Sequence, residues 1–192
     1  MNLKKILSHC LLLAPALALL TSGCTTTSST DARALKISAG ELVDLSRYTV
    51  ATVLPFEMSE TARKKDAQFG TSFAANIAGR IKSDFPQLFQ EVRWNQPLHQ
   101  PHELIITGVI DTYERDDLGL RILLIGLGAV HFTGKLVLKD GGDQRELMNA
   151  PFSKLWAWGG LLGAAKTMET LVPETAAAAA KTVAAQKQKG AK

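Results

Sequence analysis

The chain has two kinds of hydrophobic periodicity, and each predicts a different secondary structure. Over residues 61–84 large apolar side chains recur every four positions, which is the spacing of one face of an α-helix. Pro86 ends this predicted helix. An apolar stripe on a helix faces the core far more often than a ligand. We therefore expect these side chains to be buried: Phe69, Phe73, Ile77 and Ile81.

Other segments carry the patterns of β-strands. Residues 48–56 are β-branched and apolar, and residues 88–94 form a shorter run of the same kind. Residues 103–113 are apolar on both faces at first, which indicates a central strand. Residues 130–139 alternate between apolar and polar, as a half-buried strand does. Two glycines within residues 140–143 predict a hairpin turn, from which a strand returns over residues 145–156.

An alanine-rich stretch from Ala165 to Gln186 predicts a terminal helix, and the basic residues 187–192 are expected to fray. The predicted order is strand, helix, several antiparallel strands and helix. This order is typical of an α+β fold, and we expect a two-layer sandwich with a mostly antiparallel sheet and two helices on one face. The domain is expected to span residues 45–186.

The amino-terminal segment has the layout of an export signal. Lys4 and Lys5 give it a positive start, residues 6–20 are mostly apolar, and residues 21–23 are small. The apolar part is shorter than the roughly 20 residues of a membrane-spanning helix. We therefore predict a signal peptide over residues 1–23 rather than a permanent membrane anchor.

The end of this segment, Leu20-Thr21-Ser22-Gly23-Cys24, resembles the lipobox of bacterial lipoproteins. The resemblance implies that Cys24 receives a diacylglycerol thioether, that cleavage precedes it, and that its new amino group takes a fatty acid such as palmitate. Leu20 stands one place earlier than the usual leucine, and Thr21 occupies that place. Two or three acyl chains anchor a protein durably, so the resemblance predicts a membrane partner through the lipid.

The residues after Cys24 bear on localisation. In Gram-negative lipoproteins an aspartate after the cysteine commonly retains the protein in the inner membrane. Thr25 stands there, so the resemblance implies the outer membrane, facing the periplasm. The hydroxyl-rich run that follows lacks core-forming side chains, and we predict a flexible tether over residues 24–44.

Composition and charge exclude some classes of function. The net charge of +4 falls to about +2 without Lys4 and Lys5, since 20 basic residues then face 18 acidic ones. This is too weak a basic character for a nucleic-acid partner. The two cysteines, Cys10 and Cys24, both lie at the amino end, so neither can cross-link the domain.

No pattern in the sequence indicates an enzyme, a cofactor or a metal site. The pair His99 and His102 has a chelating spacing, but flanking prolines exclude a helix and no third ligand is near. The acidic stretch over residues 111–117 lacks the glycine and spacing of a calcium loop. We expect it to be a solvated turn and a candidate charged contact surface, formed by Asp111, Glu114, Asp116 and Asp117.

Two glycine-rich apolar segments, residues 118–130 and 156–165, leave two alternatives open. Glycines among large side chains permit close backbone packing, which is the favoured interpretation. The alternative is an exposed apolar patch for a partner or lipid, in which Trp156 and Trp158 would be the contact residues.

With these elements placed, the mature chain resembles a group of bacterial outer-membrane lipoproteins classed as a domain of unknown function. The resemblance rests on "VATVLPF", "RIKSDFPQLFQEV", "ELIITGVIDTY" and "RILLIGLGAVHFTGKLVLKDG". The opening also looks like the amino-terminal domain of the Tol system's periplasmic protein and like lipoproteins that activate peptidoglycan synthases. These resemblances imply a lipid-anchored envelope protein that binds another envelope protein. The alternative is a cell-wall or small-ligand binding module that uses the basic end of the terminal helix.

Overall fold

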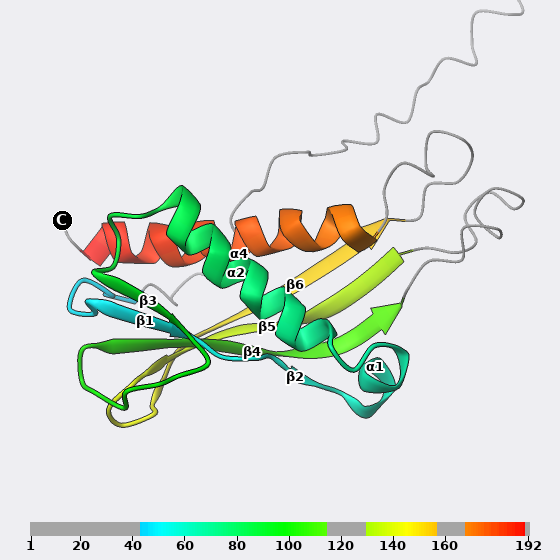
Figure 1. Ribbon diagram of the computed structural model, residues 1–192, viewed down its shortest axis with the longest axis horizontal. Helices are drawn as coiled ribbons and strands as arrows, with labels where there is room; N and C mark the ends of the chain where they lie inside the picture. The colour runs from blue at the N-terminus through cyan, green and yellow to red at the C-terminus, as the bar shows by residue number, and fades with distance from the viewer. Residues whose placement is uncertain (1–42, 115–129, 157–167, 191–192) are drawn as a thin grey trace, which may run out of the picture. The chain divides into compact units, whose positions relative to one another are not determined.

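The computed structural model describes residues 43–114, 130–156 and 168–190, all within the unit Asp31–Lys192 (Figure 1). Predictions for residues 1–42, 115–129 and 157–167 lie outside this part of the chain. The elements follow in chain order: β1 (Val50–Val53), β2 (Glu57–Met58), α1 (Glu60–Lys65), α2 (Phe69–Asp84), β3 (Glu91–Trp94), β4 (Glu103–Glu114), β5 (Val130–Asp140), β6 (Glu146–Trp156) and α4 (Met168–Gly190).

The described strands form one six-stranded sheet in the order β3-β1-β4-β5-β6, with β2 paired to β4. This confirms the α+β class, but the expectation of a mostly antiparallel sheet is wrong, because the sheet is mixed. Strand β1 runs parallel to both β3 and β4, and β2 runs parallel to β4. Among the described strands, only the pairs β4–β5 and β5–β6 are antiparallel.

Two connections account for the parallel pairing. Helix α2 carries the chain back between β1 and β3, so that both strands start from the same end of the sheet. The eight residues 95–102 then carry it back again between β3 and β4. The prolines in these eight residues indicate a loop, and so short a connection gives no sign of a crossover.

The predicted helix over residues 61–84 is two helices, so the described residues hold three helices rather than two. Ser59 begins α1 by accepting a hydrogen bond from the Ala62 backbone N–H. Asp66 ends it with an extended backbone, and its side chain accepts a hydrogen bond from the Gln68 N–H. The apolar face of α2 is buried as predicted: Phe69, Phe73, Ile77 and Ile81.

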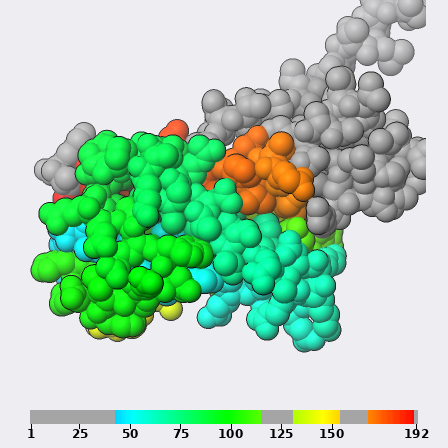
Figure 2. Space-filling view, viewed as in Figure 1, coloured from blue at the N-terminus to red at the C-terminus, as the bar shows by residue number. Residues whose placement is uncertain are grey.

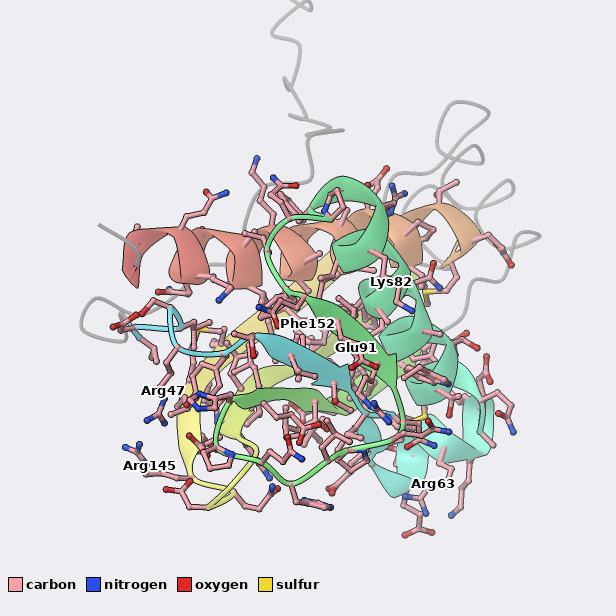
Figure 3. All side chains as sticks on the ribbon, turned by 60° about the vertical axis from the view of Figure 1, so that its left-hand side comes forward. Arg47, Arg63, Lys82, Glu91, Arg145 and Phe152 are labelled. Atoms are coloured by element: carbon pink, nitrogen blue, oxygen red, sulfur yellow. The ribbon has the colours of Figure 1, made fainter. Side chains whose placement is uncertain are left out.

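Buried side chains of α2 and α4 share one hydrophobic cluster with alternate residues of the strands. Its centre is aromatic: the Phe73 ring lies 5.2 Å from Phe56 and 5.7 Å from Phe132, measured between centroids. Phe152 of β6 lies between the sheet and the helices (Figure 3). The outer surfaces of α2 and α4 lie side by side in Figure 2.

Helix α4 extends to Gly190, so its last turn includes residues 187–190, which the sequence predicts as part of a fraying tail. The buried side of α4 is mostly alanine, valine and leucine, and its two buried threonines donate to the carbonyls four residues earlier. Each of these bonds satisfies a hydroxyl donor with the carbonyl of the preceding turn. Among the described helices none is long and apolar enough to cross a bilayer.

Candidate functional site

The strand residues that alternate with the core residues form a second face of the sheet, which we call the helix-free face. On β4 these residues are Ile105, Thr107 and Val109. The register places Lys139 beside Ile105, Val137 beside Thr107 and Lys135 beside Val109. No described helix residue lines the hollow found on this face.

The crossover loop, residues 95–102, closes one end of the helix-free face. The Leu98 backbone N–H donates to both carboxylate oxygens of Glu103, each 2.9 Å away. The Thr52 hydroxyl donates to the same carboxylate over 2.5 Å. Burial alone would raise the pKa of Glu103, but these hydrogen bonds outweigh it and lower the pKa below its ordinary value. Glu103 is therefore ionised and holds the loop in place.

Beyond the loop the helix-free face carries a hollow of about 530 Å³. Its floor is closed, since Ile105 is 1% and Val137 is 7% exposed. A volume of this size falls in the range of small-ligand sites, which is roughly 300–1,000 Å³. The remaining lining is a mixture of apolar, amide and charged residues: Leu54, Pro55, Glu57, Asn95, Thr107, Gly108, Val109, Lys135, Lys139, Gln144, Glu146 and Asn149.

Two lysines of this lining have no ion-pair partner among the described residues. Lys135 and Lys139 lie four residues apart on β5, with Val137 between them on the same face. Glu146 is the register partner of Lys139, but its carboxylate accepts a hydrogen bond from the Asn149 side chain instead. The hollow therefore presents two unpaired ammonium groups to whatever enters it.

The rim of the hollow contains strained backbone. Asn95 and Gln144 line it with φ angles of 51° and 59°, in the left-handed region that most residues avoid. His99 has a φ angle of 56°, and its ring lies 3.4 Å from the Gln144 side-chain nitrogen. These are the only non-glycine residues with positive φ in the described ranges. Such strain gathers at functional sites more often than elsewhere.

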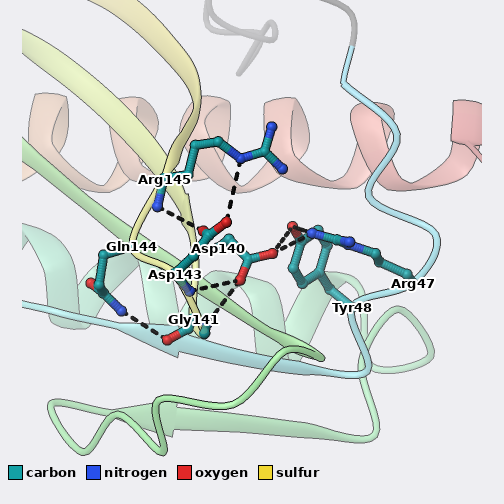
Figure 4. Close-up of polar contacts among 8 residues, drawn as sticks. Arg47, Tyr48, Asp140, Gly141, Asp143, Gln144 and Arg145 are labelled. Carbon is teal, nitrogen blue, oxygen red and sulfur yellow. Dashed lines mark hydrogen bonds and ion pairs between the residues drawn. The ribbon is translucent and has the colours of Figure 1, made fainter.

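A second polar cluster holds residues 43–48, which we call the tether root because the predicted tether leads into them. The Asp140 carboxylate accepts hydrogen bonds from the Tyr48 hydroxyl at 2.7 Å, from Arg47 and from the Gly142 N–H at 2.8 Å (Figure 4). Arg47 and Arg145 lie at the same end of the sheet (Figure 3). Burial opposes ionisation of Asp140, but the hydrogen bonds, that of Tyr48 foremost, lower its pKa.

The terminal helix holds the same segment from the other side. Lys187 Nζ donates to the carbonyl oxygens of Leu45, Ser46 and Tyr48, at 3.2, 3.2 and 2.6 Å. Burial lowers the pKa of Lys187, and the nearby Asp44 carboxylate partly offsets this. Every charged group of the cluster is thus engaged within the fold, so the cluster fixes the tether root rather than a ligand.

The structure places only some of the residues singled out from the sequence. Cys24, Trp158, Asp116 and Asp117 lie outside the described residues, as do both glycine-rich segments almost entirely. Trp156 ends β6, but its side chain is outside the described part. The structure therefore does not test the predicted lipidation or tryptophan contacts.

The histidine pair and Glu114 lie in the described part of the chain. His99 and His102 lie in the crossover loop, and the His102 carbonyl accepts from the Thr49 N–H at 3.0 Å. Glu114 ends β4 and pairs with Lys65 at 3.5 Å. Within the described ranges no three histidine, cysteine or acidic side chains are grouped so that they could hold a metal ion.

No protein-family model and no curated protein matches the sequence. The fold, however, is similar to solved structures. A PelC variant from Paraburkholderia phytofirmans, a dodecamer, matches with a TM-score of 0.50 and 12% identity over 75% of this chain and 91% of its own. A Xanthomonas campestris protein of the DUF330 family matches with a TM-score of 0.51 and 10% identity, over 83% of this chain and 95% of its own. At these identities the similarity concerns the fold alone.

Proposed function

We propose that this chain is a lipid-anchored envelope protein, held in the outer membrane through Cys24 and facing the periplasm. Its domain would bind another envelope component without catalysing a reaction. The observation that carries the binding role is the hollow on the helix-free face, which combines a closed apolar floor with the unpaired Lys135 and Lys139.

Two features support the anchored arrangement. The lipobox-like run before Cys24 is followed by a polar stretch that ends near the tether root. The tether root is held from two sides, by Asp140 and by Lys187.

The partner we propose is another envelope protein. A second candidate is the cell wall, whose small peptide units would also fit a concave site such as the hollow. The crossover loop contributes Asn95 to the lining of the hollow, and Glu103 holds that loop through the Leu98 backbone N–H.

The anchor is tested by mass spectrometry of the mature amino terminus. We expect a chain that begins at an acylated Cys24, and we expect Cys24→Ser to be released from the membrane fraction. A mature chain that retains residues 1–23, or an unmodified Cys24, would overturn the anchor.

The binding role is tested by photo-crosslinking in a Gram-negative bacterium that produces the full chain. A crosslinking residue at Asn149, in the hollow, should give a discrete adduct with an envelope component. The matched control is the exposed Thr71 on α2, where no such adduct is expected. Equal labelling from both positions, or none from Asn149, would contradict a binding role for the hollow.

A further inference from the structure

We infer that the occupant of the hollow is a short, extended peptide that carries two carboxylates and an amino group. This inference rests on the proposed binding role of the hollow and names the chemistry of its ligand. It is carried by the arrangement of charged and amide groups around the apolar floor.

The charges set the spacing of the ligand's acidic groups. Lys135 and Lys139 are four residues apart on one strand, so their Cα atoms lie about 13 Å apart at roughly 3.3 Å per residue. Both lysine side chains are flexible four-carbon stems, so carboxylates that lie closer together than this on a short extended peptide would reach both ammonium groups. Glu57 and Glu146 also line the hollow and favour an amino group in the same ligand.

The amide side chains suit a peptide backbone. Asn95 offers both a donor and an acceptor to a peptide group. Gln144 and Asn149 offer their side-chain oxygens as acceptors, since their amide nitrogens donate to the Gly141 carbonyl and to Glu146. The Asn95 side chain makes no hydrogen bond within the described structure. The Asn95 backbone N–H donates to the Val53 carbonyl oxygen, so the residue is held in position. Its side-chain amide is left to hydrogen-bond with a ligand.

Other ligand classes fit the lining less well. None of the described residues that line the hollow is aromatic, so a sugar ring would find no face on which to stack. The carboxylates of Glu57 and Glu146 oppose a polyanion, and the charged rim opposes a lipid chain. A peptide with both signs of charge satisfies the lining without leaving a charge unpaired.

The experiment uses calorimetric titration of the full chain, purified in detergent, with the cell-wall tetrapeptide L-alanyl-γ-D-glutamyl-meso-diaminopimelyl-D-alanine. This probe carries carboxylates and amino groups on an extended backbone. We expect binding that weakens with rising salt and falls about fivefold in the double variant Lys135→Gln with Lys139→Gln, since exposed ion pairs contribute modestly. Lys181→Gln on α4, another exposed lysine, is the matched control and should bind like the wild type.

The same tetrapeptide with its carboxylates amidated tests whether binding depends on the charge of the ligand. We expect the amidated form to bind more weakly than the acidic form. Equal affinity for the acidic and amidated forms, or equal affinity of the wild type and the double variant, overturns the inference. So does a tetrapeptide that does not bind while the Asn149 crosslink persists, because the hollow then binds something else. Loss of both the crosslink and the tetrapeptide binding removes the proposed binding role itself.

Discussion

Lys187 donates a hydrogen bond from Nζ to the Tyr48 carbonyl oxygen over 2.6 Å, although 139 residues separate the two in the chain. The same ammonium group reaches the carbonyls of Leu45 and Ser46. It also lies over the Phe89 ring, 5.1 Å from the ring centroid. One side chain near the end of α4 thus fixes the backbone of the tether root.

Replacing Lys187 should loosen this attachment. Lys187→Met keeps a long side chain but removes all three donors, and we expect a loss of about 1–3 kcal/mol in the free energy of unfolding. Urea denaturation measures the loss, and hydrogen exchange at the Tyr48 amide should accelerate. Lys189→Met changes an exposed lysine of the same turn and should leave both measurements unchanged. Equal effects of the two substitutions would refute the role of Lys187.

Asp140 should contribute stability that depends on pH. The fold lowers its pKa below the ordinary 3.8, so this stability is present above pH 3.8 and is lost as the pH falls through the folded-state pKa. Asp140→Asn should cost about 1–3 kcal/mol at neutral pH, and its difference from the wild type should shrink in acid. Chemical denaturation at several pH values measures this difference.

The control for Asp140 lies three residues away. Asp143 is exposed and pairs with Arg145 at 3.6 Å in solvent. We expect Asp143→Asn to change the stability by less than about 1 kcal/mol at any pH. A cost for Asp140→Asn that stays constant from neutral to acidic pH would contradict our assignment.

Gly108 of β4 leaves no room for a side chain, because β5 and the Phe56 ring approach its Cα closely. A Cβ there would lie 2.1 Å from the Lys135 carbonyl oxygen and 2.5 Å from the Phe56 ring. We expect Gly108→Ala to lower the stability by about 3 kcal/mol, because backbone must move. Gly79→Ala on α2 meets nothing within 4 Å and should raise the stability by about 0.5–1 kcal/mol. Thermal unfolding measures both effects: the midpoint temperature should fall for Gly108→Ala and rise for Gly79→Ala.

Pro151 should protect the open edge of the sheet. Strand β6 is paired on one side only among the described strands, and Pro151 stands opposite Lys135 of β5. Its nitrogen has no hydrogen to donate, so it interrupts the outward row of donors that could pair with another chain. Pro151→Thr restores that donor and should increase self-association, measured by light scattering on storage. Ser153→Thr adds a β-branched residue to the same strand without a new donor and should not do so.

Much of the fold could be predicted because its signals are local. The four-residue spacing placed the buried face of α2, and the alternation over residues 130–139 placed β5. The two glycines after Asp140 marked the turn, which is confirmed. Each of these patterns depends on a few neighbouring residues, so the rest of the chain did not need to be known.

The pairing of strands could not be predicted in the same way. Parallel pairing of β1 with β4 depends on where residues 95–102 lead, and their prolines indicate only a loop. The sequence also gives no sign of the break at Asp66, because the charged residues before it suit the solvated face of one long helix.

The candidate site shows the same limit. Lys135 and Lys139 could be placed on the polar side of a strand, but a polar side gives no sign of a hollow with a closed floor. That hollow depends on Asn95 of the crossover loop and on residues of four strands, β2, β4, β5 and β6. The role of Lys187 was missed for a related reason, since its partners lie at the other end of the domain.

The long separation between Tyr48 and Lys187 has a consequence for biogenesis. If the chain is exported as proposed, it passes through the translocation channel with its amino end first. The tether root then reaches the periplasm long before Lys187 does, and it has no terminal helix to hold it. We therefore expect Cys24 to be acylated before Lys187 can hold residues 43–48, and the tether root to be fixed to the domain only when translocation is nearly complete.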